Sequence, residues 1–393
     1  MLAPTHASGR EIGPESDFCH AIRSLPQGDE LALLPGDYQG PCVIDRDGGA
    51  GAPLVIRAAD PARRPRIVYG GRDSDVIQVR ASHITLRGLE FGPTQQGVDA
   101  VRIFNGGDVT VEDCAFTHLG GIAVVANHSS IHGLMVRRNV VRNSTSTAMY
   151  FGCHDGEGCM VSGLVVEANF IENVTALDPE IGYGIQFKLN SSGTIRDNIV
   201  INTKGPSIMI YGSRYPKPSV VERNVTIGSR TSSGIVVGGG PAVIRNNIAE
   251  SNELVGIELT DYKNRGLLRT ILVANNTVYG NRLSGITVPE TGLSNVTVVN
   301  NAADANGSPN PFPVPQIGLS MAGNVNCTDV ACFLDPEHRD FSPGPHSRLK
   351  GAGVWVKTPW MPRDDFFGIR RGSRSTAGAI ERPSGPLGLV PPR

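Results

Sequence analysis

The sequence predicts an all-β solenoid, in which every turn of the chain adds one short strand to each of several parallel sheets. The first observation is a phrase of the form V/I-x-x-N-x-V/I, which recurs seven times at intervals of 23 to 30 residues. The second is a composition with 48 glycines and only 6% aromatic residues, which suits tight turns between short strands. We expect the asparagines to form a hydrogen-bonded ladder along the axis; they are Asn139, Asn169, Asn198, Asn224, Asn247, Asn276 and Asn301.

The chain divides into four parts. Residues 1–30 form an N-terminal segment, in which ESDFCHAIRSL at 15–25 has apolar residues at helical spacing and predicts a short helix that caps the first coil. Residues 31–306 are the predicted parallel solenoid. The proline-rich stretch SPNPFPVPQ ends the period, so 307–382 are predicted to form an irregular C-terminal cover and 383–393 a flexible tail.

A second phrase repeats beside the first and indicates which side chains face outward. Strand alternation points its first apolar residue inward, and the residues one and three positions later outward. The inward series is Ile77, Val101, Ile122, Met149, Ile185, Ile208, Ile235, Ile257 and Ile286. The outward positions of the central coils include Arg102, Tyr150, Gln186, Lys188 and Tyr211. The longest step of the series, from Met149 to Ile185, contains two loops, and insertions in solenoids often carry function.

The bulk composition restricts the partners and the compartment. A formal net charge of −1 provides no global field for nucleic acid or an anionic membrane, and no run is long enough for a transmembrane helix. The oligomeric state stays open. Cysteine spacing suggests three disulfides and one unpaired interior cysteine, namely Cys19–Cys42, Cys153–Cys159, Cys327–Cys332 and Cys114. We therefore expect a secreted or periplasmic protein with its signal peptide removed, although seven reduced cysteines in a cytosolic protein fit the same sequence.

The outward cluster has the chemistry needed to act on a polymer of acidic sugars. Lysine or arginine neutralises a carboxylate, tyrosine or lysine transfers a proton, and aromatic rings stack on pyranose faces. His154, in the CHDGEGC loop, is a further candidate for proton transfer. The substrate-binding candidates are Arg102, Gln186, Asn127, His128 and Asn190. Each of these residues alone would more often be an ordinary solvated residue, and only the clustering favours a site.

Removing the proton α to a uronate carboxylate requires a cation beside that carboxylate. The cation would be Ca²⁺ held by oxygen ligands, or a fixed arginine or lysine. The candidate calcium ligands are Asp155, Asp178 and Glu180, on the two loops beside the cluster. Because no calcium-loop motif is present, these acids are better explained as solvated loop residues.

Nearly the whole chain resembles the right-handed parallel β-helix superfamily of carbohydrate-active proteins, through LPQGDELALLPGDYQG, ITLRGLEF, the asparagine phrase and the ending DFFGIRR with AGAIE. Within it, GYGIQFKLNSSGTIRDNIV is similar to a segment of alginate lyases and chondroitinase-B-like lyases. The resemblance implies that Lys188 is the Brønsted base at C5 of a uronate. Those lyases carry an arginine on the next strand, where SIMIYGSR offers Tyr211 or Arg214 instead. AMYFGCHD resembles mannuronan C5-epimerases, which implies Tyr150 and His154 as an acid and base pair, although the aspartate between them is absent.

The sequence therefore predicts a polysaccharide lyase that cleaves an acidic, uronate-containing glycan by β-elimination. The catalytic candidates are Lys188, Tyr211, Tyr150, His154 and Arg214. Two alternatives stay open, a uronan C5-epimerase and a non-catalytic glycan-binding β-helix surface protein. A pectin-degrading type of hydrolase is disfavoured, because the outward positions offer no clustered aspartates.

Overall fold

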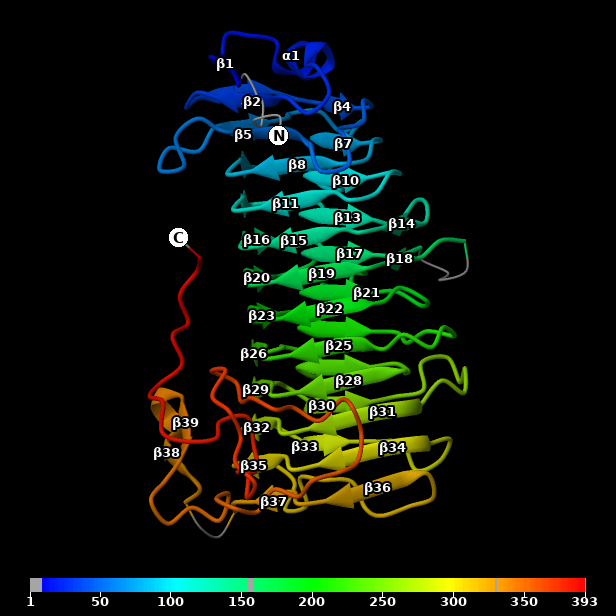
Figure 1. The fold of residues 1–393 in the computed structure, drawn as a ribbon, viewed down its shortest axis with the longest axis vertical. Helices are drawn as coiled ribbons and strands as arrows, with labels where there is room; N and C mark the ends of the chain where they lie inside the picture. The colour runs from blue at the N-terminus through cyan, green and yellow to red at the C-terminus, as the bar shows by residue number, and fades with distance from the viewer. Residues whose placement is uncertain (1–8, 154–157, 329–330, 393) are drawn as a thin grey trace, which may run out of the picture. The chain divides into compact units, whose positions relative to one another are not determined.

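The computed structural model describes residues 9–153, 158–328 and 331–392. The chain groups into two compact units, Met1–Gly182 with Pro391–Arg393, and Tyr183–Val390. Each unit consists mainly of short parallel strands that follow one another around successive coils, as the colour sequence in Figure 1 shows. The predicted all-β parallel solenoid is therefore confirmed within each unit.

The first unit has a helical cap followed by three parallel sheets. Helix α1 spans Phe18–Ser24, begins at the N-cap Asp17 and buries its apolar face, which confirms the predicted cap helix. Sheet A contains β1 (Arg10–Ile12), β2 (Glu30–Leu33), β5 (Leu54–Ala58), β8 (Ile84–Arg87), β11 (Thr110–Glu112), β15 (Met135–Arg137) and β19 (Leu164–Glu167). Sheet B contains β3 (Asp37–Gln39), β6 (Arg66–Val68), β9 (Glu90–Phe91), β12 (Ala115–Thr117), β16 (Val140–Ser144) and β20 (Phe170–Val174). Sheet C contains β4 (Cys42–Ile44), β7 (Ile77–Val79), β10 (Val101–Ile103), β13 (Val124–Ala126) and β17 (Met149–Phe151), and a small extra pair is formed by β14 (Ile131–His132) and β18 (Val161–Ser162).

The second unit repeats the same three sheets and ends in the C-terminal cover. Sheet A contains β22 (Gly193–Arg196), β25 (Ser219–Glu222), β28 (Ala242–Arg245), β31 (Arg269–Ala274), β34 (Ser294–Val299) and β36 (Leu319–Ala322). Sheet B contains β23 (Ile199–Thr203), β26 (Val225–Ile227), β29 (Ile248–Glu250), β32 (Thr277–Tyr279), β35 (Ala302–Asp304) and β37 (Val325–Asn326). Sheet C contains β21 (Ile185–Phe187), β24 (Ile208–Ile210), β27 (Ile235–Val237), β30 (Val255–Leu259) and β33 (Ser284–Thr287). The cover contributes the antiparallel pair β38 (Phe333–Asp335) and β39 (Asp340–Pro343), with the 3-10 helix η1 (Pro336–His338) between them.

The asparagine ladder forms as predicted. In the first unit the side-chain oxygen of Asn169 accepts hydrogen bonds from the backbone and the side chain of Asn139, both at 3.0 Å. In the second unit the same pair of bonds links successive members of one row, Asn198, Asn224, Asn247, Asn276, Asn301 and Asn324. A second row at another turn, which we did not predict, consists of Asn252, Asn281 and Asn306. Its spacing of 29 and 25 residues, counted along the sequence, repeats that of the first row.

The strand register confirms the inward series except on one coil. The second-unit members form one buried row of paired residues, Ile185, Ile208, Ile235, Ile257 and Ile286. In the first unit Val101 pairs with Val124 and not with Ile122, so the prediction for this coil was wrong by two residues. The turn before β13 takes up two more residues than the repeat suggests. Because side chains alternate with a period of two, the slip keeps the same residues outward and places Val125 beside Arg102.

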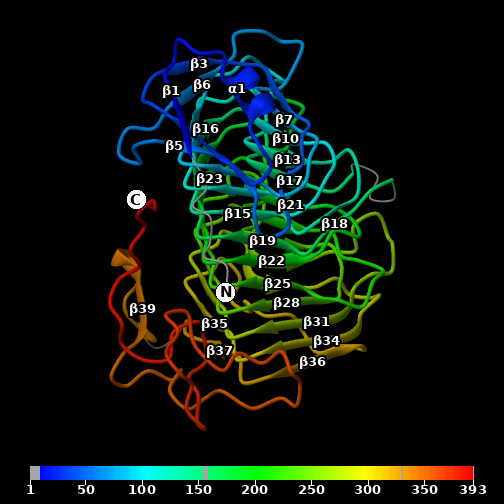
Figure 2. The ribbon, with the colours of Figure 1, turned by 45° about the horizontal axis from the view of Figure 1, so that its top comes forward.

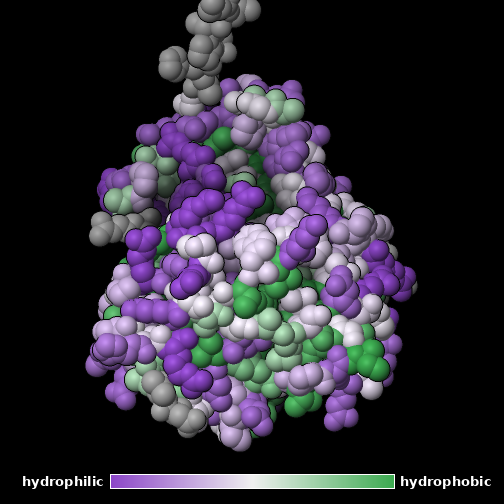
Figure 3. Space-filling model, turned by 60° about the horizontal axis from the view of Figure 1, so that its bottom comes forward, coloured by the Kyte–Doolittle hydropathy of each residue, from purple (hydrophilic) through white to green (hydrophobic). Residues whose placement is uncertain are grey.

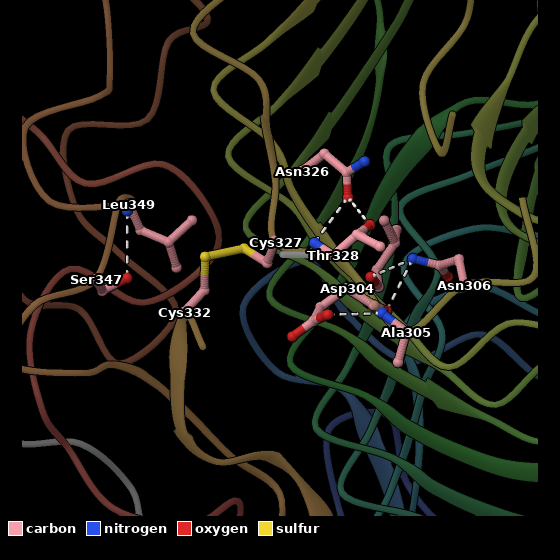
Figure 4. Close-up of a disulfide and its surroundings, with 10 residues drawn as sticks. Asp304, Ala305, Asn306, Asn326, Cys327, Thr328, Cys332, Ser347 and Leu349 are labelled. Carbon is pink, nitrogen blue, oxygen red and sulfur yellow. Dashed lines mark hydrogen bonds between the residues drawn. A yellow bond between two sulfur atoms is a disulfide. The ribbon is translucent and has the colours of Figure 1, made fainter. Parts of the chain in front are cut away.

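Two of the three predicted disulfides are present. Cys153–Cys159 closes a short loop, and Cys327–Cys332 links the end of β37 to the start of β38 (Figure 4). The predicted Cys19–Cys42 bond is wrong, since both cysteines are free and buried, as is Cys114. The thiol of Cys19 lies 3.6 Å from the carbonyl oxygen of Pro41 as a hydrogen-bond donor. The neighbouring Cys19 thiol and burial raise the pKa of Cys42 well above its usual range, so the Cys42 sulfur remains a protonated thiol.

The C-terminal cover packs on the outer surface of the second unit's coils. The segment with β38 and β39 lies beside sheet B in Figures 1 and 2, where Phe333 and Phe341 join the apolar cluster around Ile248. Leu387, in the segment predicted to be a flexible tail, is buried in the same cluster and donates its backbone N–H to Arg339. The packed cover therefore reaches at least to Leu387.

The far end of the second unit exposes apolar residues among polar ones. Figure 3 looks toward this end and shows hydrophobic patches separated by hydrophilic side chains. Val314 and Ile317, in the proline-rich segment before β36, are among the exposed apolar residues. Strands β36 and β37 still pair in parallel with the preceding coil, so the solenoid continues beyond the predicted boundary at 306.

Replacing Asn247 by alanine should lower the free energy of unfolding by about 2–4 kcal/mol, because it removes the buried acceptor of the Asn224 backbone N–H. Urea unfolding followed by circular dichroism measures this loss. Asn324→Ala is the matched control, since Asn324 ends the row and is only half-buried. Equal, small losses for both variants would contradict a structural role for the ladder.

Candidate active site

The predicted residues of the second unit come together on the outer face of sheet C. Gln186 pairs with Met209 across β21 and β24, and the backbone N–H of Tyr211 donates to the carbonyl of Phe187 at 3.0 Å. Alternation then places Lys188 beside Tyr211 on the same face. Although these residues face outward from the coil, their side chains are buried, with 5% of Lys188 and 2% of Gln186 exposed.

Two segments lie over this face of sheet C. Tyr183 lies just before β21, and the loop 260–268 follows β30. An apolar cluster joins the two segments to the strands; it consists of Tyr183, Leu189, Met209, Tyr211, Val236 and Leu267, with Tyr262 packed against it. The strand residues therefore form the floor of the site, and Tyr183, Tyr262 and Leu267 form its walls.

Local backbone chemistry shapes the loop 260–268. The carboxylate of Asp261 accepts the backbone N–H groups of Arg265 at 2.9 Å and of Gly266 at 3.0 Å. This aspartate turn reverses the chain and presents Tyr262 and Arg265 to the site. On the neighbouring coil Gly238 leaves room for the site, because a Cβ there would lie 3.3 Å from the Cα of Tyr211 and 3.2 Å from the Cε of Met209, which is tighter than ordinary van der Waals contact.

Two tyrosine hydroxyls and one amide form a hydrogen-bonded network inside the site, and a third aromatic ring packs against it. The hydroxyl groups of Tyr183 and Tyr211 are 3.2 Å apart, and the Gln186 amide donates to the Tyr211 hydroxyl at 3.1 Å. The rings of Tyr211 and Tyr262 meet edge to face, with their centroids 4.7 Å apart. The other side-chain atom of Gln186, its Oε1, is buried and has no hydrogen-bond partner. An unsatisfied acceptor in such a place is ready to receive a hydroxyl from a ligand.

Three cations surround the tyrosines. The Lys188 Nζ lies 4.4 Å from the centroid of the Tyr211 ring. The centroid of the Tyr262 ring lies 5.0 Å from the Arg265 Cζ and 5.6 Å from the Lys263 Nζ. The Nη1 of Arg265 is buried without a hydrogen-bond partner. Positive charge and an unused guanidinium donor make the site suited to an anionic ligand.

Burial changes the proton affinities of these groups. Desolvation, reinforced by the charges of Arg265 and Lys263, lowers the pKa of Lys188 to about 8. Desolvation, together with the neighbouring Tyr183, raises the pKa of Tyr211 far above its ordinary value. At pH 7 about a tenth of Lys188 is therefore an uncharged amine that accepts a proton, and this fraction grows as the pH rises toward 8, while Tyr211 keeps a proton to donate.

Two further second-unit candidates lie in the turns that follow the strands. Asn190 adopts a left-handed conformation at φ 65°, and its side-chain oxygen accepts the backbone N–H of Arg214 at 3.0 Å. Its observed contact is therefore structural, because it joins two successive turns. The side chain of Arg214 is exposed. A different arginine, Arg265 of the loop 260–268, contacts the Tyr262 ring.

Within the first unit, Arg102 is bound by other protein groups. Its guanidinium donates to Asp75 at 2.8 Å, to Asn127 at 2.8 Å, and also to Asp99. Binding a substrate carboxylate would break some of these bonds. His128 is exposed and its ring meets that of Phe104 at 5.0 Å.

The remaining first-unit candidates are Tyr150 and the acidic loop residues. Tyr150 is half-buried on β17, and His154 and Asp155 lie outside the described residues. Asp178 is exposed, and the carboxylate of Glu180 accepts the hydroxyl of Ser146 at 2.6 Å. Within the part of the chain that the structure describes, no three His, Cys, Asp or Glu side chains gather as metal ligands. The calcium site stays a prediction, since Asp155, one of its three proposed ligands, lies outside the described residues.

The sequence reasoning missed four residues of the site, namely Tyr183, Tyr262, Lys263 and Arg265. One signal was available: the segment TDYKNRG interrupts two apolar strands and combines an aromatic residue with basic ones. This segment lies in the interval of the inward series from Ile257 to Ile286, which has 29 residues and is shorter than the interval from Met149 to Ile185.

Comparison with known proteins identifies the family. The family model described as the right handed beta helix region matches residues 99–269 and 164–329, which together cover more than half of the chain. The chain belongs to the right-handed β-helix family. No curated protein matches its sequence. No helix among the described residues of this β-helix protein is long and apolar enough to cross a membrane.

Solved structures share the fold of this β-helix protein at low sequence identity. One is a PL6-family alginate lyase in complex with a trisaccharide, with a TM-score of 0.53 and 14% identity over 98% of this chain and 96% of that chain. A mutant of the PL6-family alginate lyase AlyGC gives a TM-score of 0.53 and 13% identity over 98% of this chain, which spans 59% of that chain. The lacto-N-biosidase of Eubacterium ramulus gives a TM-score of 0.54 and 10% identity over 81% of this chain and 67% of that chain. These similarities show the fold alone.

Lys188→Met should stabilise the β-helix by about 1–3 kcal/mol at neutral pH, because it removes a buried cation whose pKa is lowered. Below about pH 8 the amine is charged in the folded and unfolded states, so the folded state bears the full free-energy cost of burying that charge. The difference in the free energy of unfolding between Lys188→Met and wild type should shrink as pH rises from about 8 to the usual lysine pKa, where the amine also loses its proton in the unfolded state. Urea midpoints at several pH values measure it, with the exposed Lys217→Met as control. A Lys188→Met protein that is less stable at every pH would contradict the lowered pKa.

Proposed function

We propose that this β-helix protein is a polysaccharide lyase that cleaves an acidic, uronate-containing glycan by β-elimination. One observation carries the proposal: Lys188, a lysine with a lowered pKa, shares a buried site with the unpartnered guanidinium nitrogen of Arg265. A base beside a free cationic donor is what abstraction of a proton α to a carboxylate needs.

In the proposed reaction the uronate carboxylate binds the Nη1 of Arg265, with Lys263 adding positive charge. The Nζ of Lys188 takes the C5 proton, and the electrons of the C5–H bond form the C4–C5 double bond. The C4–O4 bond breaks, and the leaving oxygen takes a proton from Tyr211. Solvent then returns both side chains to their starting protonation states.

The geometry favours proton abstraction for two reasons. The cations Arg265 and Lys263 stand on a loop held by the Asp261 turn, so they need little reorganisation as the carboxylate gains charge. The aromatic walls exclude water and strengthen each charge interaction. Tyr262, which is half-buried, has a ring face suited to stacking on a sugar.

The similar folds are consistent with this proposal but do not choose among reactions. Two of them are alginate lyases, and another is a lacto-N-biosidase. The site residues therefore carry the assignment. We further propose that the protein acts outside the cytosol, since its two disulfides suit an oxidising compartment where such polymers occur.

Lys188→Met should reduce turnover of the preferred uronate polymer by at least about 100-fold, because no other base takes its place. Wild-type kcat/KM should rise with pH and level off above about 8, as the amine loses its proton. Lys188→Arg should not restore activity, since a guanidinium stays charged.

The assay follows the ultraviolet absorbance of unsaturated products from alginate, polygalacturonate, hyaluronan and chondroitin, with Lys217→Met as the control. No product from any polymer would refute the lyase. Solvent hydrogen exchange at C5 without chain cleavage would instead identify a C5-epimerase that uses the same base. Binding without turnover or exchange, unaffected by Lys188→Met, would identify a glycan-binding protein.

Arg265→Ala should lower kcat/KM by roughly 10- to 100-fold, because it removes the charged donor for the carboxylate. Arg214→Ala is the matched control and should change kcat/KM by less than about threefold, since its side chain is exposed to solvent. A larger loss of kcat/KM for Arg214→Ala than for Arg265→Ala would show that the loop 260–268 is not part of the site.

A further inference from the structure

We propose that the C-terminal cover forms a second binding site for acidic saccharides, separate from the Lys188 site. A cavity of about 590 Å³ lies between the cover and the turn that joins sheets A and B. Asn275 in that turn follows β31 and precedes β32, whereas Lys188 directly follows β21 of sheet C. This volume is within the usual range of small-ligand pockets.

The charge of the cavity favours an anion. Among the described residues that line it, Arg363, Arg370 and Arg371 are basic and none is acidic. Arg363 and Arg370 are exposed, so both guanidinium groups can reach a ligand. The side chain of Arg371 is only 5% exposed and is held by Glu381 at 3.1 Å.

Two buried polar atoms at the cavity have no partner. Arg371 donates through both terminal nitrogens to Glu381, Asn246 and backbone carbonyls, yet its Nε has no hydrogen-bond acceptor. Asn275 is fully buried and donates to the carbonyl of Thr376, yet its Oδ1 accepts no hydrogen bond. One unused donor and one unused acceptor, both on residues that line the cavity, match the carboxylate and hydroxyl groups of a sugar acid.

The walls are held in place and carry an aromatic platform. Val354 exchanges two hydrogen bonds with the side chain of Asn300, at 2.8 and 2.9 Å, and Gly353 donates to Ser375 at 2.9 Å. Trp355 follows directly and is 71% exposed, although large aromatic residues are usually covered. An exposed indole beside arginines is suited to stacking on a pyranose ring whose carboxylate binds the arginines.

The choice of an acidic saccharide as ligand rests on the proposed function. The evidence for an anion site is independent of it, and consists of the positive charge, the unpartnered atoms and the exposed indole. A second site on the cover would hold a polymer chain near the protein and raise the local concentration of substrate at sheet C.

Tryptophan fluorescence tests the site directly, because the chain has two tryptophans and Trp355 is the one on the cavity. In the full-length Trp360→Phe protein, Trp355 is the sole emitter. We expect saturable emission changes with trimannuronate or trigalacturonate and none with the neutral maltotriose. Replacing both Arg363 and Arg370 by alanine should weaken binding at least roughly tenfold, whereas Lys357→Ala, an exposed cation outside the cavity lining, should leave it within about twofold.

No saturable response to either trisaccharide, or an equal loss with Lys357→Ala, would overturn the site. A response to inorganic phosphate but to neither trisaccharide would also overturn it. The lyase assay on the same protein separates the two proposals: turnover without a Trp355 response defeats only the cover site. A Trp355 response without turnover supports the cover site and defeats only the lyase.

Discussion

The hydrogen bonding between successive parallel coils is the constraint on which the rest of the structure depends. Each coil must end its strands at the same turns, because buried asparagine amides bond both the backbone and the side chain of the neighbouring coil. This repeats the register from coil to coil. Side chains one coil apart then stand about 4.8 Å from each other, so neighbouring strands can place reactive groups within contact distance.

The site on sheet C uses this regularity and adds one irregular element. Strand β21 provides Gln186, the residues directly after β21 and β24 are Lys188 and Tyr211, and the loop 260–268 brings Tyr262 and Arg265 over them. Covering an outward-facing lysine with aromatic rings and placing cations near it costs stability. Such a cost is typical of a functional site, where a lowered lysine pKa is useful for proton abstraction.

Periodicity made the regular parts predictable from sequence, while the site depended on parts without a repeat. The ladder, helix α1 and the outward position of Lys188 all followed from spacing and alternation. The loop that supplies Arg265 did not, because an aspartate turn with three positive φ angles has no periodic signature. Cys19 and Cys42 were paired from their spacing alone, and the structure leaves both as buried thiols.

The proton affinity of Lys188 connects the fold to the proposed chemistry, since a buried, charge-crowded amine is the base that the reaction needs. Nitrogen-15 NMR of protein with labelled lysine side chains measures this affinity directly, and Lys188→Met assigns the signal. We expect the Lys188 amine to titrate with a pKa of about 8. Titration near 10.5, the ordinary lysine value, would contradict the central claim that sheet C and the loop 260–268 together form a site that holds a partly neutral lysine.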